Sequence, residues 1–171
     1  MTASLVVASS VGEALDELAA GPGRTTAEPD ELLEAVEVAR PREGTGSCYA
    51  RLEYRRQMEI AVVGATAVLT LENGRVTDPR VAITALAPTI RRVPEAEEAL
   101  SGSDAGRAPI EQAAQAAATA AEPISDVRAS AGYRRAMTAV VVRRAIEVAL
   151  ARARGDEFPI PASPALHGGL S

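Results

Sequence analysis

Two apolar runs joined by a tight turn dominate the middle of the chain. Residues 59–71 are apolar at almost every position, whereas residues 76–87 alternate between apolar and polar side chains. Asn73-Gly74, between the runs, tolerates the positive φ of a type I′ turn, so the sequence predicts a β-hairpin. The first run is expected to be a central strand covered on both faces. Pro79 in the second run indicates an edge position or a bulge, because proline donates no ladder hydrogen bond.

A third strand is expected upstream of the hairpin, over residues 47–56. Its alternation places one set of side chains inward, namely Cys48, Ala50, Leu52 and Tyr54. The opposite face carries Tyr49, Arg51, Glu53 and Arg55. Two strands alone are marginally stable in water, so this third strand and a helical cover are both required.

Three helical segments follow the hairpin. Pro94 opens a short helix through Leu100, since proline suits the first helical position. An alanine-rich helix is expected over residues 109–122, and a long helix over residues 130–154. The long helix carries a broad apolar stripe made of Tyr133, Met137, Val140, Val141, Ile146, Val148, Leu150 and Ala151. Its other faces are expected to turn four arginines toward solvent or a partner: Arg134, Arg135, Arg143 and Arg152.

The turn-rich connector 41–46 divides the chain. Before it, Ser10 and Glu13 match a capping box that starts a helix, Gly21-Pro22-Gly23 stops that helix, and residues 30–39 are expected to form a helical turn and a short strand. We therefore expect an N-terminal arm (1–43), a domain (44–154) and a flexible tail (155–171). The expected fold is α+β: a three-stranded antiparallel sheet packed against a helical bundle, with a short N-terminal helical arm.

Composition and charge narrow the function classes. The net charge is −5 and all 18 basic residues are arginines, scattered along the chain, which argues against nucleic-acid binding. The single cysteine, Cys48, and the single histidine, His167, predict neither a disulfide framework nor a metal site. No apolar run reaches membrane length, and we expect a cytoplasmic protein. No nucleophile–base pair or paired carboxylates can be assembled, so the chain alone is expected to be non-catalytic.

Short motifs in a fixed order connect residues 44–154 to a known family. They are Gly46-Ser-Cys-Tyr-Ala-Arg51, Arg55-Arg56-Gln-Met-Glu-Ile-Ala-Val-Val-Gly64, Asn73-Gly74-Arg75-Val76, Arg80-Val-Ala-Ile83, Ala87-Pro88-Thr89, Arg91, Glu95-Ala-Glu97, Leu100-Ser-Gly102, Pro123-Ile-Ser-Asp126-Val-Arg128-Ala-Ser130, Tyr133-Arg134 and Arg143-Arg144-Ala145. This succession resembles the C-terminal domain of the FAD-binding (medium) subunit of the xanthine dehydrogenase and carbon monoxide dehydrogenase family, the molybdenum hydroxylases. The resemblance implies a three-stranded sheet packed on helices. It also implies an oxidoreductase complex in which electrons pass from a molybdenum cofactor through two iron–sulfur clusters to FAD.

The chain departs from that family where the flavin pyrophosphate binds. The family's flavin domain carries glycine-rich loops of the forms Ala-Gly-Gly-Thr and Gly-Gly-Asn, and neither occurs here. Residues 4–24 resemble the opening helix of that domain and residues 28–41 its closing segment, so the arm resembles a remnant whose middle is deleted. Pyrophosphate requires converging backbone amides on glycine loops. FAD is thus implied by the resemblance, but tight independent binding is not expected.

The resemblance implies three flavin-proximal residues: Tyr49, Arg51 and Arg55. Some family members have an aromatic residue close to the flavin near the start of this first strand, and Tyr49 falls on the polar strand face beside Arg51. An ordinary cross-strand aromatic pair is the structural alternative for Tyr49. Arg55 and Arg56 match the family's paired basic residues, and a salt bridge is the alternative there.

Other polar residues of the motifs have structural explanations. Helix capping and a local ion pair account for Asp126, Arg128 and Ser130. Cys48 alternates inward and is expected to behave as a small buried hydrophobic residue.

Two functions remain open at the level of sequence. The first is an FAD-subunit-type component of a molybdenum hydroxylase that helps close the flavin site. Its expected partners are the molybdopterin-binding and iron–sulfur subunits, together with a separate flavin domain. The alternative is a flavin-free interaction or assembly module, which binds those subunits or a second copy of itself, or a truncated remnant with no redox role.

Overall fold

The computed structural model describes residues 23–30, 40–55 and 59–158. The helix expected near the N-terminus and the strand expected before residue 40 lie outside these residues, as do Arg56 and His167. The chain divides into two compact units, Met1–Pro41 and Arg42–Ser171. In the first unit, the described residues 23–30 form neither a helix nor an extended strand.

In the second unit, four antiparallel strands form one sheet in the order β1-β2-β3-β4. They span Thr45–Leu52 (β1), Val63–Glu72 (β2), Arg75–Thr84 (β3) and Arg91–Arg92 (β4). The central position predicted for the first hairpin strand is confirmed, because β2 pairs with both β1 and β3. The prediction of three strands misses β4, whose two arginines pair with Ile83 and Ala82. A two-residue strand is too short to show a period of two, so the sequence pattern carried no signal for it.

The hairpin between β2 and β3 has the predicted turn. Asn73 and Gly74 adopt φ angles of 51° and 75°, as a type I′ turn requires. Between Val68 and Thr70 the register with β3 shifts, and on the opposite strand Asp78, at φ 46°, precedes Pro79. Pro79 therefore lies at a β-bulge, one of the two positions that its missing N–H predicted.

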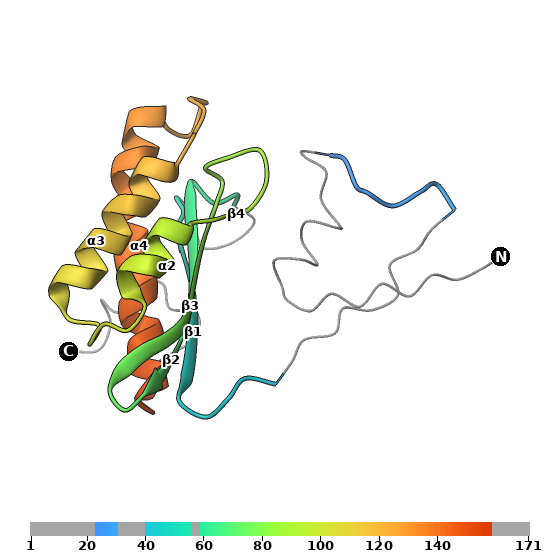
Figure 1. Ribbon diagram of the computed structural model, residues 1–171. Coiled ribbons are helices and arrows are strands. Elements are labelled where there is room, and N and C mark those ends of the chain that lie inside the picture. The colour runs from blue at the N-terminus through green and yellow to red at the C-terminus, as the bar shows by residue number, and fades with distance from the viewer. Residues whose placement is uncertain (1–22, 31–39, 56–58, 159–171) are drawn as a thin grey trace. The chain divides into compact units, whose positions relative to one another are not determined.

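Three helices pack against one face of this sheet (Figure 1). They span Pro94–Leu100 (α2), Arg107–Ala120 (α3) and Ala131–Ala153 (α4), within two residues of the predicted bounds. α4 lies directly on β1 and β2, α2 lies over β3, and α3 packs against both of these helices. The prediction that the central strand is covered on both faces is wrong for the described part of this unit, because the second face carries no helix.

The core between the sheet and the helices is built from small and branched aliphatic side chains. Small residues allow one unusually close contact between β1 and α4. A Cβ atom on Gly46 would lie 1.9 Å from the carbonyl oxygen of Ala149 and 2.5 Å from the amide nitrogen of Ala153. No side chain fits there, so Gly46 lets the two backbones touch.

The buried face of α4 differs from the predicted stripe at its N-terminal end. Tyr133 was expected in the stripe but is 45% exposed, whereas Arg134 was expected in solvent and is buried. Farther along, the predicted residues Val141, Ile146, Val148 and Leu150 are buried. The helix begins where capping predicted, since the Ser130 hydroxyl accepts a 3.2 Å hydrogen bond from the Tyr133 amide.

At the end of α4, the backbone N–H of Asp156 donates to the Ala151 carbonyl, and Phe158 packs against the core. Among the described residues, no helix has the length and hydropathy that crossing a membrane requires.

Candidate functional site

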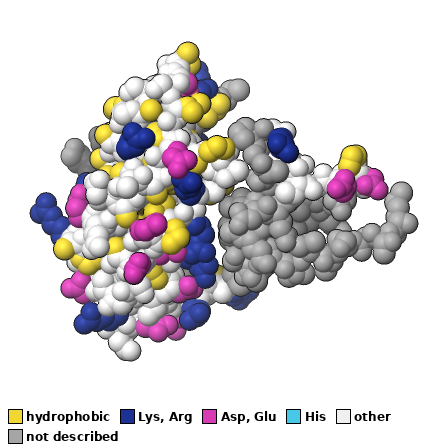
Figure 2. All heavy atoms as spheres, turned by 45° about the horizontal axis from the view of Figure 1, so that its top comes forward, with side chains coloured by type: hydrophobic (Ala, Val, Ile, Leu, Met, Phe, Trp, Pro, Cys, Tyr) yellow, Lys and Arg dark blue, Asp and Glu magenta, His cyan; other side chains and the backbone are white. Residues whose placement is uncertain are grey.

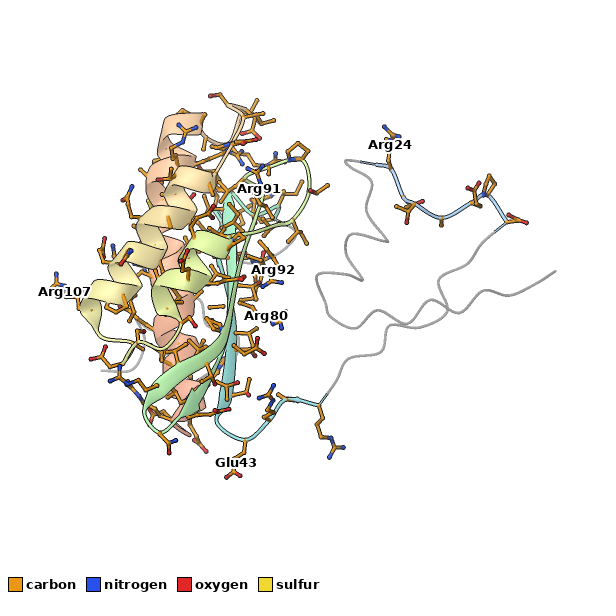
Figure 3. All side chains as sticks on the ribbon, viewed as in Figure 1. Arg24, Glu43, Arg80, Arg91, Arg92 and Arg107 are labelled. Carbon is orange, nitrogen blue, oxygen red and sulfur yellow. The ribbon has the colours of Figure 1, made fainter. Side chains whose placement is uncertain are left out.

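The sheet face on which none of the described helices packs, here called the open face, presents one row of side chains across all four strands. The strand register places Tyr49 opposite Thr66, Thr66 opposite Ala82, and Ala82 opposite Arg92. In the stick view, the side chains of Arg80 and Arg92 project away from the helices, whereas Arg107 lies on the helical side (Figure 3). The open face therefore combines one aromatic ring with several guanidinium groups.

Tyr49 lies across the backbone of Gly64 on the neighbouring strand. A Cβ atom on Gly64 would lie 2.9 Å from the Tyr49 hydroxyl oxygen, 3.2 Å from its Cε2, and 2.4 Å from the Thr84 methyl carbon. The ring is 49% exposed, so one part of it covers the glycine while the rest faces outward. An isolated glycine inside a strand signals a close approach of this kind, and the sequence thus contained a cue for this contact.

The hydroxyl of Tyr49 is a neutral hydrogen-bonding group. Partial burial raises its pKa above the ordinary value of 10.0, the nearby Arg51 guanidinium acts in the opposite direction, and Glu53 adds to the rise. At neutral pH the phenol therefore keeps its proton and can donate a hydrogen bond.

Arg51 lies on the same face of β1 as Tyr49 and is paired with an acidic side chain. Its Nη2 lies 2.5 Å from Oε2 of Glu53, whose side chain is only 12% exposed. A guanidinium has five N–H donors, so this pairing leaves further donors on Arg51. The structure thus brings two of the three predicted site residues, Tyr49 and Arg51, onto one surface.

Arg55, the third predicted site residue, lies outside the strand. β1 ends at Leu52, and Arg55 donates from Nε to Oε2 of Glu59 over 2.9 Å. Hydrogen bonding from Arg55, helped by the charge of Arg128 3.9 Å away, lowers the pKa of Glu59. This is the ion pair that the alternative interpretation of Arg55 predicted; its contact with a cofactor stays a prediction.

At the β4 end of the row, Arg92 forms an ion pair with Glu97. Arg92 donates from Nε and Nη2 to the two carboxylate oxygens of Glu97, over 3.0 and 2.6 Å. Glu97 also accepts the Val81 backbone N–H over 3.0 Å, and the adjacent Val93 amide donates to the Val81 carbonyl. Bonding to Glu97 raises the pKa of Arg92. The pair therefore fastens β4 and α2 to β3.

Arg134 is the largest departure from the sequence-based expectations. It is 4% exposed, and its Nη1 donates to the carbonyl oxygens of Val62 and Ala85 over 3.0 and 3.3 Å. Its Nη2 donates to Oδ1 of Asp126 over 2.6 Å. Ala85 has a φ of 64°, in the left-handed region, and the long forked donor of Arg134 reaches its carbonyl together with that of Val62. Helical spacing from Thr138 and Val141, both buried, could have placed Arg134 on this face.

Asp126 completes that network from the loop before α4. Besides Arg134, its Oδ1 accepts the backbone N–H groups of Arg128 and Ala129 over 2.8 and 3.1 Å. These hydrogen bonds, the one from Arg134 first, lower the pKa of Asp126 to about 2. The local ion pair and the capping predicted for residues 126–130 are confirmed.

The remaining reactive groups offer no chemistry in the described residues. Cys48 is buried as predicted, and burial raises the pKa of its thiol, with Arg152 acting in the opposite direction. No cluster of three or more His, Cys, Asp or Glu side chains that could hold a metal ion occurs in the described ranges.

The chain is similar to proteins of known function over most of its length. The model of the CO dehydrogenase flavoprotein C-terminal domain matches residues 48–149. The carbon monoxide dehydrogenase medium chain of Afipia carboxidovorans is 35% identical over 130 residues, which are 76% of this chain and 45% of that one. The nicotine 6-hydroxylase medium subunit of Paenarthrobacter nicotinovorans is 33% identical over 137 residues, or 80% and 47% of the two chains.

The fold is also similar to that of solved structures. The structure of carbon monoxide dehydrogenase from Hydrogenophaga pseudoflava matches with a TM-score of 0.76 at 34% identity, covering 80% of this chain and 47% of that chain. Quinoline 2-oxidoreductase from Pseudomonas putida 86 matches with a TM-score of 0.74 at 26% identity. The chain thus spans about half the length of the relatives it matches. It belongs to the family of CO dehydrogenase flavoprotein C-terminal domains.

Proposed function

We propose that this chain is an FAD-subunit-type component of a molybdenum hydroxylase and that its open face closes one side of the flavin site. The observation that carries the proposal is the half-exposed ring of Tyr49, laid over Gly64 on a helix-free surface. It is supported by the family and by relatives such as the xanthine dehydrogenase FAD-binding subunit of Escherichia coli O157:H7, 29% identical over 136 residues.

The open face fits one part of FAD, the isoalloxazine ring. Aromatic side chains pair with planar rings in offset-stacked or edge-to-face arrangements, and Tyr49 offers both its ring and a protonated hydroxyl. Because Gly64 has no side chain, the Tyr49 ring can rest on the strand backbone, and the outward part of the ring is left for a planar group. Arg51 adds N–H donors on the same strand face for carbonyl oxygens of the ring.

The described residues do not fit the other part of FAD, the pyrophosphate. α2 begins with Pro94 and carries Glu95 and Glu97 in its first turn, which repel an anion. Before α3, the Gly106 amide already donates to the Asp104 carboxylate over 2.9 Å. At α4, the side chains of Ser130 and Ser125 accept the amides of Tyr133 and Ala131. The pyrophosphate must therefore be held by polypeptide other than these residues.

The proposed mechanism follows from this division. FAD, when bound, supplies the electron-accepting ring of the complex. This chain's residues cover one side of the ring, donate hydrogen bonds from Tyr49 and Arg51, and keep water from that side. The molybdopterin-binding and iron–sulfur subunits are the proposed partners. The exposed Arg135 and Arg144 on α4 are the candidates for contact with acidic surfaces of those subunits, since Arg143 already donates to both carboxylate oxygens of Glu111 over 2.9 and 3.1 Å.

The second candidate function is a flavin-free interaction or assembly module, which binds the same subunits or a second copy of this chain. The observation that favours it is the lack of any phosphate-binding arrangement among the described residues. The two functions differ in whether flavin is present when the chain is in its complex.

The proposal is tested by replacing Tyr49 in the complex purified from the cells that make it. Tyr49→Ala should raise the fluorescence of bound flavin and lower the FAD content after desalting, because a ring that covers the flavin is removed. Tyr49→Phe keeps the ring and should retain the FAD, while Ser47→Ala on the same strand is the control for strand stability. A Tyr49→Ala complex with unchanged FAD content and flavin spectrum would refute the proposed closure.

A further inference from the structure

Three connections converge at one end of the sheet: residues 53–62 between β1 and β2, 85–90 between β3 and β4, and 121–130 between α3 and α4 (Figure 1). Hydrogen bonds join them directly. The Tyr54 hydroxyl donates to the Arg128 carbonyl, and the Glu122 amide donates to the Leu86 carbonyl over 2.8 Å. Arg134 links all three through its bonds to Val62, Ala85 and Asp126. We call the described residues of these connections, with the first turn of α4, the loop end.

The loop end concentrates the exposed apolar side chains of the described chain. Of the seven large hydrophobic residues that are exposed, six lie here: Tyr54, Ile60, Ile90, Ile124, Val127 and Tyr133. Val127 is 100% exposed and Ile124 is 74% exposed. In the space-filling view, which brings this end forward, hydrophobic side chains lie at its surface (Figure 2). Scattered exposed apolar residues are ordinary, but six at one end of a small domain indicate an interaction surface.

The charged side chains of the loop end are already paired with one another. Arg55 pairs with Glu59, Arg91 with Glu122, and Asp126 with both Arg128 and Arg134. These charges therefore have local partners, and the groups left for a binding partner are mostly apolar. Since Arg134 also fixes the three connections to each other, the apolar side chains are held in place before binding, which lowers the entropic cost of association. The surface thus fits an apolar patch on a folded protein.

We propose that the loop end is the docking surface for the polypeptide that carries the flavin. This proposal rests on the proposed function, in which Tyr49 contacts the flavin. Three residues around Tyr49, namely Arg51, Gly64 and Thr84, lie at those ends of their strands that lead into the loop end. A polypeptide that holds FAD against Tyr49 must then pass beside the loop end. In the relatives the match covers 45–47% of the medium chain, so a segment of comparable length lies outside the matched part.

A site-specific crosslink tests which protein occupies the loop end. Val127 is replaced by the photoreactive residue p-benzoylphenylalanine, and the complex is irradiated and purified from the cells that make it. Because the Val127 side chain is fully exposed, the replacement should leave the fold intact. The matched control carries the same photoreactive residue at Glu72, an exposed position that ends β2 at the opposite end of the sheet.

The expected result is a crosslink from position 127, and none from position 72, to a polypeptide that contains bound flavin. In addition, Val127→Asp should reduce co-purification of that polypeptide at least tenfold without changing the circular dichroism of the chain. A crosslink to a second copy, to an iron–sulfur or molybdenum subunit, or to no protein in an intact complex would overturn the proposal. The Tyr49 test gives an independent result. If position 127 crosslinks to the flavin-containing polypeptide but Tyr49→Ala leaves the FAD content and the flavin spectrum unchanged, only the proposed closure of the flavin site is refuted.

Discussion

Asp126, in the loop that precedes α4, and Arg134, in the first turn of that helix, form a short hydrogen-bonded ion pair. Their Oδ1 and Nη2 atoms are 2.6 Å apart, and the guanidinium also reaches the carbonyl oxygens of Val62 and Ala85. One side chain thus holds together the ends of three connections that are far apart in sequence. A buried, hydrogen-bonded guanidinium of this kind is costly to remove because its partners are left without donors.

Arg134→Met is expected to destabilise the domain by about 3 kcal/mol, because two backbone carbonyls and one carboxylate lose their donor. Urea unfolding followed by circular dichroism measures this change in the free energy of unfolding. Arg135→Met is the matched control, since its side chain is exposed one residue farther along α4, and its effect should stay within about 0.5 kcal/mol. Equal effects of the two variants would contradict the role of the buried network.

The same pair gives a pH dependence. Folding lowers the pKa of Asp126 from its ordinary 3.8 to about 2, chiefly through the hydrogen bond from Arg134. The stability that this carboxylate contributes is therefore complete above about pH 4 and is lost as the pH falls toward about 2. We expect the difference in melting temperature between the wild type and Asp126→Asn to narrow over this interval. A difference that is constant from pH 6 to pH 2 would show that the carboxylate charge is not involved.

The close contact between β1 and α4 predicts opposite effects for two glycines. Gly46→Ala places a methyl group within 1.9 Å of the Ala149 carbonyl oxygen, so the strand and the helix must separate, at a cost of about 1–3 kcal/mol or more. Gly132→Ala in the first turn of α4 meets no atom within 4 Å and should be neutral or stabilising, by up to about 1 kcal/mol. Thermal unfolding distinguishes them; a tolerated alanine at position 46 would contradict the observed packing.

The central strand gives a second matched pair of variants. Val63 is fully buried, so Val63→Asp puts a charge without a partner into the core and should cost about 4 kcal/mol or more, or prevent folding. Val68 is half-buried on the open face and lies opposite Arg80, so the carboxylate of Val68→Asp has a cation across the strand pair. In denaturant unfolding, Val63→Asp should lose much more free energy of unfolding than Val68→Asp. A Val63→Asp variant with the wild-type midpoint would contradict the position of β2.

The sequence predicted those parts of the fold that depend on local signals. Asn73-Gly74 determines the hairpin, Pro94 and Ser130 determine where two helices begin, and alternation around Cys48 determines the inward face of β1. Each of these depends on backbone dihedral angles or on side-chain periodicity within a few residues, which a single sequence displays directly.

What the sequence did not predict depends on contacts between distant residues. β4 exists because two residues meet β3, and Arg134 is buried because Val62, Ala85 and Asp126 converge on it. From the sequence alone, an arginine in a helix is expected to face solvent. The burial of Arg134 is favourable only because these three partners accept its hydrogen bonds. Within the candidate site, Tyr49 and Arg51 follow from the alternation of β1, whereas the contact of Tyr49 with Gly64 depends on the register with β2.

The most direct measurement is the visible absorbance of flavin after desalting, made on two samples: the purified chain mixed with FAD, and the complex isolated from the cells that make it. If the chain supplies one side of a flavin site, the chain alone should pass the column colourless and folded, while the complex should retain FAD near one equivalent. Flavin retained by the chain alone would contradict the proposal that other polypeptide is needed to hold the pyrophosphate. A complex without flavin would contradict the flavin role itself and leave the assembly module as the function.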